Sequence, residues 1–171
     1  TNDVDSGESI TEANSGGTDV VAVVSSTDFV NMTAASFDEI EQIRFAGANQ
    51  TGTFTGAQLT GETLLLTETA AGTSNLILNV ASGTTVTFAN MTASTFTSGS
   101  DTITINGSTG NETITAPDLA TTINGDNGDD TIDGGDGTDS LVGGSGNDIY
   151  LFETNDVDSG ESITEANSGG T

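Results

Sequence analysis

The stretch GDNGDDTIDGGDGTDSLVGGSGNDIYL, residues 125–151, decides the fold of this chain. It contains eight glycines and seven aspartates but no basic residue. A large apolar residue nevertheless recurs at every ninth position, as Ile132, Leu141 and Tyr150. Like charges at this density repel one another, so an ordered segment of this composition needs something that neutralises its carboxylates.

The nine-residue spacing continues upstream of this stretch. The residue before each apolar position is Thr or Ser from Thr95 to Ser140, and Ile149 then breaks that row. Because adjacent side chains of a strand face opposite ways, we expect the apolar row to point inward and the Thr row outward. One inward apolar residue per fixed period is the signature of a β-solenoid. The apolar row is Phe96, Ile105, Ile114, Ile123, Ile132, Leu141 and Tyr150.

Three consecutive nonads follow the pattern G-G-x-G-x-D-x-U-x, where U is a large apolar residue. They are GDNGDDTID (125–133), GGDGTDSLV (134–142) and GGSGNDIYL (143–151), and the first has Asp126 in place of the second glycine. The nonad GSTGNETIT (107–115) is a weaker version with Glu112 at the aspartate position. The nonad APDLATTIN (116–124) keeps only the apolar residue.

These nonads resemble the calcium-binding repeats of the RTX (repeats-in-toxin) family, whose fold is a parallel β-roll. The resemblance implies that carboxylates and loop backbone oxygens together bind Ca²⁺, a hard cation that takes about six to eight oxygen ligands. Glycines suit such loops because they adopt backbone angles closed to other residues. The metal-site residues that the resemblance implies are Asp130, Asp139, Asp148, Glu112, Gly125, Asp126, Gly128, Gly134, Asp136, Gly137, Gly143 and Gly146.

Within that set, the resemblance implies that Asp130, Asp139 and Asp148 ligate calcium directly. Two nonads form one coil of the roll, so loops 18 residues apart should stack, with Glu112 next to Asp130 and Asp130 next to Asp148. On the other side Thr121 stacks with Asp139, which predicts a weaker site there. We expect about two to four ions in all. Four further acids should contribute negative potential and outer-shell contacts to the calcium sites rather than direct bonds: Asp126, Asp129, Asp133 and Asp136.

Plain polar turns are the alternative explanation for these aspartates, because Asp and Gly both favour turns. Turns do not require an acid at one fixed place in every nonad, however. Unneutralised carboxylates stacked about 4–5 Å apart would also repel by several kcal/mol at an effective dielectric constant of about 20. The pattern therefore favours calcium binding.

The remainder of the chain is predicted to be strands separated by turn residues. One stretch, residues 34–43, has apolar residues at helical spacing and could form a turn or two of helix. The predicted fold class is all-β: a parallel β-roll or β-solenoid with calcium-binding nonapeptide loops at residues 89–152, preceded by an irregular β-rich segment at 1–88. The predicted strands outside the nonads are 9–11, 19–24, 43–45, 53–55, 63–67, 75–80 and 86–88.

The chain begins with the sequence that ends it. Residues 1–18 and 154–171 both read TNDVDSGESITEANSGGT, an offset of 153 residues. This identity predicts one period of a tandem array, with residues 153–171 starting the next repeat; a duplication introduced at the ends is the alternative. The acidic cluster of Asp156, Asp158 and Glu161, repeated from residues 3–8, could hold a cation at the junction or be a solvated loop.

Charge limits the partners of this protein. It has 26 acidic residues against one basic residue, Arg44, for a formal net charge of −25. Such a chain is repelled by nucleic acids and by anionic membrane surfaces. The absence of Cys and His excludes disulfides and Cys/His zinc sites, and no apolar run is long enough to insert into a membrane. The expected partners are calcium ions and neighbouring copies of the same repeat, with possible self-assembly.

The residues for catalysis are largely missing, since the chain has no His, Lys or Cys to act as base or nucleophile. We therefore expect a protein that is not an enzyme. The predicted function is a calcium-dependent structural repeat of an extracellular bacterial surface protein, such as an adhesin, surface layer (S-layer) or filament, exported by a type I secretion system. The alternatives are an ice-binding solenoid, through its outward Thr row, and a polysaccharide-acting one.

Overall fold

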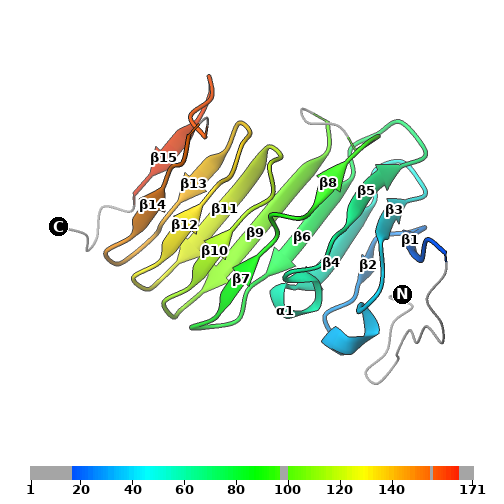
Figure 1. Cartoon of the computed structure of the whole chain (residues 1–171), viewed down its shortest axis with the longest axis horizontal. Coiled ribbons are helices and arrows are strands. Elements are labelled where there is room, and N and C mark those ends of the chain that lie inside the picture. Colours follow the sequence, from blue (N-terminus) through cyan, green and yellow to red (C-terminus); the bar gives the residue numbers. More distant parts are fainter. Residues whose placement is uncertain (1–16, 97–99, 155, 166–171) are drawn as a thin grey trace.

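The computed structural model describes residues 17–96, 100–154 and 156–165. The chain winds into a solenoid in which each strand pairs in parallel with a strand of the neighbouring coil (Figure 1). A long sheet runs along the whole solenoid, and two shorter sheets succeed one another opposite it. The long sheet comprises β2 (Thr27–Asp28), β4 (Thr51–Thr55), β6 (Asn75–Asn79), β9 (Thr102–Ser108), β11 (Thr121–Asp126), β13 (Ser140–Val142) and β15 (Ser162–Thr164).

The two shorter sheets divide the solenoid between them. The N-terminal sheet comprises β1 (Val20–Val23), β3 (Gln42–Phe45), β5 (Leu65–Glu68) and β8 (Thr92–Ala93). The C-terminal sheet comprises β7 (Thr85–Thr87), β10 (Thr113–Thr115), β12 (Thr131–Asp133) and β14 (Ile149–Leu151). Because the long sheet pairs Asn75 with Thr102, it passes from the N-terminal coils to the C-terminal ones without a break.

Coil length distinguishes the two parts. In the N-terminal coils the paired residues lie 22 to 28 positions apart, as in Val20 with Gln42 and Thr85 with Thr113. In the coils built from the nonads the step is 18, as in Thr113 with Thr131 and Thr122 with Ser140, and the last step, from Ser140 to Ser162, is 22. The predicted coil of two nonads is therefore confirmed. The part of the chain before the nonads is also solenoid, with wider coils.

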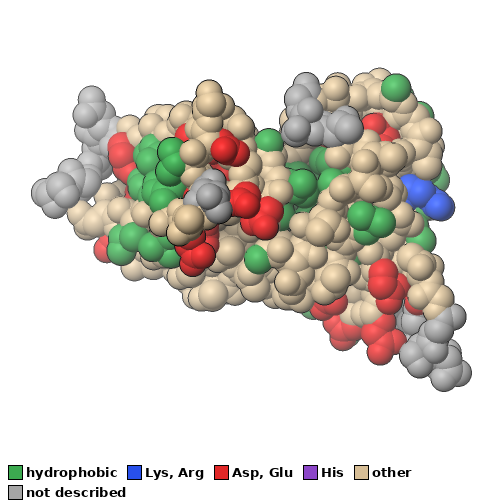
Figure 2. Space-filling model, turned by 45° about the horizontal axis from the view of Figure 1, so that its top comes forward, with side chains coloured by type: hydrophobic (Ala, Val, Ile, Leu, Met, Phe, Trp, Pro, Cys, Tyr) green, Lys and Arg blue, Asp and Glu red, His purple; other side chains and the backbone are tan. Residues whose placement is uncertain are grey.

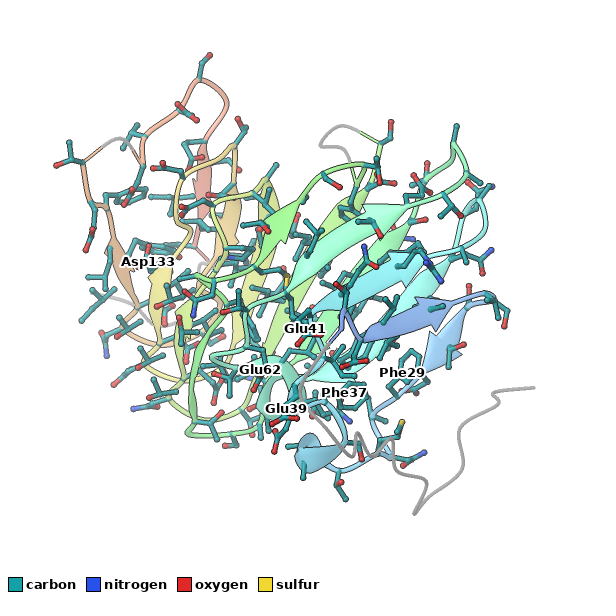
Figure 3. All side chains as sticks on the ribbon, turned by 45° about the vertical axis from the view of Figure 1, so that its right-hand side comes forward. Phe29, Phe37, Glu39, Glu41, Glu62 and Asp133 are labelled. Carbon is teal, nitrogen blue, oxygen red and sulfur yellow. The ribbon has the colours of Figure 1, made fainter. Side chains whose placement is uncertain are left out.

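The core changes character along the solenoid. In the wide coils Phe29 stacks on Phe54 with ring centroids 4.5 Å apart, and Phe37 meets Phe54 edge-on at 5.4 Å. Figure 3 shows Phe29 and Phe37 close together. In the narrow coils most nonads bury a single large side chain, worth about 1.5–3 kcal/mol when fully buried. These coils thus have little hydrophobic support. The fully buried members of the predicted inward row are Ile105, Ile114, Ile123, Ile132 and Leu141.

The ends of the inward row are less enclosed, and the outward row behaves as predicted. Phe96 is buried, whereas Tyr150 is only partly buried against the core. The threonines before each core residue are partly exposed, and Ile149, which replaces Thr in that row, is 56% exposed. The alternation of strand side chains thus holds along the narrow coils.

Short helical turns occupy the third side of the wide coils. A 3₁₀ turn, η1 (Ala34–Ser36), lies in contact with α1 (Gly56–Leu59). Buried Gln58 of α1 donates hydrogen bonds to the carbonyls of Phe29 and Met32, both at 2.8 Å, which ties one coil to the next. In the described ranges there is no helix long and apolar enough to cross a membrane.

The helix suggested for residues 34–43 is limited to the turn at η1. Glu39 has a positive φ of 67°, a conformation that interrupts a right-handed helix. Ile43 then lies in β3, so its burial comes from a strand rather than from a helical face.

The predicted strands correspond to observed ones. The predictions at 19–24, 43–45, 53–55, 63–67, 75–80 and 86–88 match β1, β3, β4, β5, β6 and β7 in that order. The prediction at 9–11 falls outside the described residues, but the identical sequence at 162–164 forms β15.

Candidate metal centre

The acids of the nonads lie at the turns, one residue before a strand begins. Asp130 precedes β12, Asp139 precedes β13 and Asp148 precedes β14. Strand pairing stacks them in two columns on opposite turns of the roll. One column contains Glu112, Asp130 and Asp148, because Thr113 pairs with Thr131 and Thr131 with Ile149. The predicted stacking at 18-residue intervals is therefore present.

Each aspartate is held by a backbone amide of the preceding coil. The amide of Glu112 donates to Asp130 Oδ1 at 2.7 Å, and the amide of Asp130 donates to Asp148 Oδ1 at 2.9 Å. On the other turn, the amide of Thr121 donates to Asp139 Oδ1 at 2.8 Å. These bonds join residues 18 positions apart, so one carboxylate oxygen of every acid is fixed by the coil before it.

The second oxygen of each aspartate has no partner in the protein. Oδ2 of Asp130, Asp139 and Asp148 is buried without a hydrogen bond. A buried unpaired carboxylate oxygen is costly, and native proteins pair such atoms or give them to a metal. The donor set therefore fits a hard cation such as calcium, which prefers oxygen ligands.

Glycines at the first position of each nonad leave room around these oxygens. A Cβ added to Gly134 would lie 2.7 Å from Asp139 Oδ2, too close for any side chain. Gly125 and Gly143 face Asp130 and Asp148 in the same way. The pattern thus keeps the space beside each orphaned oxygen clear of side chains.

Glycines at the fourth position bring the loops of successive coils together. Gly128 and Gly146 have φ angles of 134° and 143°, which L side chains rarely adopt. A Cβ on Gly128 would collide with the carbonyl oxygen of Gly110, and one on Gly146 with that of Gly128. Gly137 packs in the same conformation against Leu119 on the opposite turn. Loop backbone therefore lies against loop backbone, with carbonyl oxygens available beside the acids.

Three predicted site residues have other surroundings. Glu112 is buried, but its oxygens already accept hydrogen bonds from the amides of Gly83 at 2.8 Å and Ser108 at 2.9 Å. Asp126 is exposed and accepts a hydrogen bond from the Asn127 side chain at 3.2 Å. Asp136 is exposed on the turn that carries Asp139. Within the nonads, the orphaned carboxylate oxygens therefore belong to the three aspartates at the sixth position.

Sequence reasoning missed two features of the turns. A second ladder runs outside the acid column: the amide of Asp129 donates to Asn111 Oδ1 at 3.0 Å, and the amide of Asn147 donates to Asp129 Oδ1 at 2.8 Å. The recurrence of Asn or Asp before Glu112, Asp130 and Asp148 was its signal. The second feature is the place of Glu161: the sequence marked it as part of a junction cluster that could hold a cation, but not as the acid that continues the Asp139 column.

Burial and neighbouring acids disturb the titration of two aspartates. The pKa of Asp130 is raised to about 6, chiefly by burial and also by the charges of Glu112 and Asp148, while the hydrogen bond from the Glu112 amide lowers it. Burial likewise raises the pKa of Asp139 to about 7, with further contributions from the charge of Glu161. Both acids ordinarily titrate near 3.8. Without a cation, the fold therefore favours their neutral forms.

This predicts a pH dependence whose sign reverses with calcium. In calcium-free protein, the fold holds more protons than the unfolded chain between pH 3.8 and about 7, so its stability should fall as pH rises through that window. With calcium bound, protons compete for the same carboxylates, and stability should rise with pH. Thermal unfolding followed by circular dichroism at pH 4.5 to 7.5, in dialysed and in calcium-saturated protein, measures both slopes. Equal slopes in the two conditions would contradict the assignment.

The acids do not converge in large groups. Among the residues that the structure describes, no three acidic side chains gather around a single point that could hold a metal ion. An ion at these turns would therefore take many of its ligands from loop carbonyl oxygens, which calcium accepts as readily as carboxylates. The close contact of the loop backbones is consistent with that arrangement.

Comparison with known protein families gives the same result as the geometry. Residues 118–150 match the RTX calcium-binding nonapeptide repeat, in four copies. Repeats of this family bind calcium, and their role is structural rather than catalytic. A search of curated proteins and a search of solved structures each returned no match.

Proposed function

Because residues 118–150 are RTX calcium-binding nonapeptide repeats, we propose that this chain is a calcium-dependent structural repeat of an extracellular bacterial surface protein. The observation that carries the proposal is the set of buried Oδ2 atoms without partners on Asp130, Asp139 and Asp148. These atoms make the narrow coils dependent on a bound cation. In this proposal the three aspartates are the ligating side chains.

Calcium acts in this proposal as the signal to fold. The narrow coils have one core side chain per nonad and stacked like charges, so without calcium they lack the means to stay ordered. An ion that binds only the native state stabilises that state. RTX repeats are typical of proteins exported by type I secretion. A chain that stays unfolded where calcium is scarce and folds where it is plentiful suits that route.

The tandem identity of residues 1–18 and 154–171 supports a role in extension. Solenoid units contact mainly their neighbours, so an array of them grows in one direction. We infer that copies at a period of 153 residues form a stiff surface structure, as in an adhesin, surface layer or filament. The wide coils would then act as spacers that need no calcium, and the narrow coils as segments that calcium rigidifies.

Ice binding is the second candidate, because the C-terminal sheet carries outward threonines in adjacent strands. Thr85, Thr113 and Thr131 are in register, but Ile149 ends that row. The neighbouring row ends at Asp133, a charged side chain. Rows this short and interrupted offer a small flat surface, so we favour the structural role.

The ligand assignment predicts a loss of calcium in one variant and not in its neighbour. Asp130→Asn should lower the number of calcium ions bound per chain by at least one, because the amide keeps the hydrogen bond from Glu112 but loses the negative charge. Asp126→Asn, in the same nonad but exposed, should leave the number unchanged. Isothermal titration calorimetry measures both. Equal numbers in the Asp130→Asn variant and the parent chain would refute the assignment.

A further inference from the structure

Glu161 lies outside the nonads, yet it takes the place of the next acid in the Asp139 column. β13 pairs with β15 so that Ser140 lies opposite Ser162, and each serine directly follows an acid. The amide of Asp139 donates to Glu161 Oε1 at 2.6 Å. This is the bond that joins successive acids elsewhere in the roll, so Glu161 is the acid of a further coil.

Both acids leave an oxygen unsatisfied at this position. Oδ2 of Asp139 and Oε2 of Glu161 are buried without a hydrogen-bond partner, and the Asp139 side chain is 2% exposed. Two like charges buried in one turn repel each other strongly, because the protein interior screens them less than water does. The only basic residue of the chain, Arg44, lies in β3 near the opposite end of the solenoid (Figure 2). A cation from solution is the remaining source of neutralising charge.

The segment that leads to Glu161 is longer than a nonad, and its residues just before β15 contact the Asp139 turn. The step from Asp139 to Glu161 is 22 residues rather than 18. Gly160 packs against the Thr138 side chain, and the Ser162 amide donates to the Asp139 carbonyl at 3.0 Å. Asp156 of the same loop is buried, which adds negative potential at Asp139. The loop therefore seats a carboxylate of residues 154–171 beside one of the preceding nonad.

We propose that Asp139 and Glu161 together bind one calcium ion that joins each repeat to the next. Glu161 belongs to the segment identical to residues 1–18, so in a tandem array it is the eighth residue of the following repeat. The ion thus bridges two repeats through the last strand pair of the long sheet. This inference rests on the proposed function, because it requires a tandem array that binds calcium.

The C-terminal end of the solenoid supports this continuation. Leu151, Phe152 and Ile163 are between 42% and 48% exposed, and apolar side chains gather at this end in Figure 2. Exposed apolar surface at a sheet edge is an interaction surface rather than a solvated end. We assign this exposed apolar surface as the contact for the next coil of the following repeat. That coil begins with the strands that correspond to β1 and β2.

The joint site is tested by Glu161→Gln in the complete 171-residue chain. Glutamine keeps the length and can still accept the Asp139 amide bond. We expect one calcium ion fewer per chain by titration calorimetry, and loss of calcium-dependent hydrogen-exchange protection at β15 with protection at β12 retained. The matched control is Glu153→Gln, an exposed acid near the same loop, which should match the parent chain in both measurements.

The outcomes separate the two proposals. If Asp139→Asn loses an ion while Glu161→Gln loses none, calcium is held by the nonads alone and the joint site is wrong. If Glu161→Gln loses an ion but β15 remains equally protected, the ion does not join the repeats and the inference also fails. If the parent chain binds no calcium, it is the proposed function that fails.

Discussion

Removing calcium with excess chelator is expected to abolish most of the β-sheet signal contributed by the narrow coils, residues 107–151. These coils fully bury at most one large side chain per nonad and hold carboxylate oxygens that have no partner in the protein. Each site occupied at about 100 times its dissociation constant adds about 2.7 kcal/mol of stability, so losing several sites removes a stabilisation comparable to that of the buried side chains of the narrow core. Far-UV circular dichroism measures the loss, and adding calcium back should restore the signal.

The wide coils provide the internal control for this experiment. Residues 19–96 pack the Phe29, Phe37 and Phe54 rings and the Phe45–Phe96 pair, and they hold none of the orphaned carboxylate oxygens found in the narrow coils. Hydrogen exchange should therefore show β4 and β6 protected after chelation while β11 to β14 exchange freely. Magnesium should not restore the roll, since it demands octahedral geometry and loses its water reluctantly. A dichroism spectrum unchanged by chelator would overturn the calcium requirement.

The second large effect is expected from Gly128→Ala. The residue sits at φ 134°, and its new Cβ would strike the carbonyl of Gly110 in the coil before it. The backbone conformation lies in a region that is almost exclusive to glycine and costs about 1–3 kcal/mol for an L side chain. The forced shift between coils adds about 1–3 kcal/mol. Denaturant unfolding in saturating calcium should show a lower free energy of unfolding, together with weaker calcium binding because the loops separate.

Gly83→Ala is the matched control for this substitution. Gly83 also has a positive φ, 67°, but a Cβ there would meet nothing within 4 Å. Its variant should therefore lose only the conformational contribution of about 1–2 kcal/mol and keep the calcium affinity of the parent chain. Similar losses in both variants would mean that the close contact between loops contributes nothing.

The nonad part of the fold could be predicted from sequence because its period is constant. The nine-residue spacing determines which side chains point inward. Because two nonads make one coil, it also determines that Asp130 stacks on Asp148. The wide coils could be predicted only as separate strands, because their steps vary from 22 to 28 residues and leave no constant period. Short elements such as α1 depend on contacts between coils, like the hydrogen bonds of Gln58. No local sequence pattern predicts such contacts.

The candidate site likewise has a part that could be predicted from sequence and a part that could not. The aspartates at the sixth nonad position were predicted and carry the orphaned oxygens. Glu112 follows the same spacing, but Gly83, 29 residues away in a wide coil, satisfies one of its oxygens. Glu161 breaks the spacing, although E-S-I-T at 161–164 repeats the acid, serine and apolar order of D-S-L-V at 139–142. Position in the period predicts stacking, whereas the partners of each acid depend on the coil beside it.

The 18-residue step has a consequence for how this roll can change in evolution. Every amide-to-carboxylate bond of the acid columns joins residues one whole coil apart, as in Thr121 and Asp139. Gain or loss of two nonads therefore preserves both columns and leaves every neighbour equivalent. Gain or loss of a single nonad would move every later acid to the opposite turn of the roll. The acids of one column would then stack on those of the other column. The roll is thus free to vary in length by pairs of nonads, and the parity of their number decides which turn carries the joint to the next repeat.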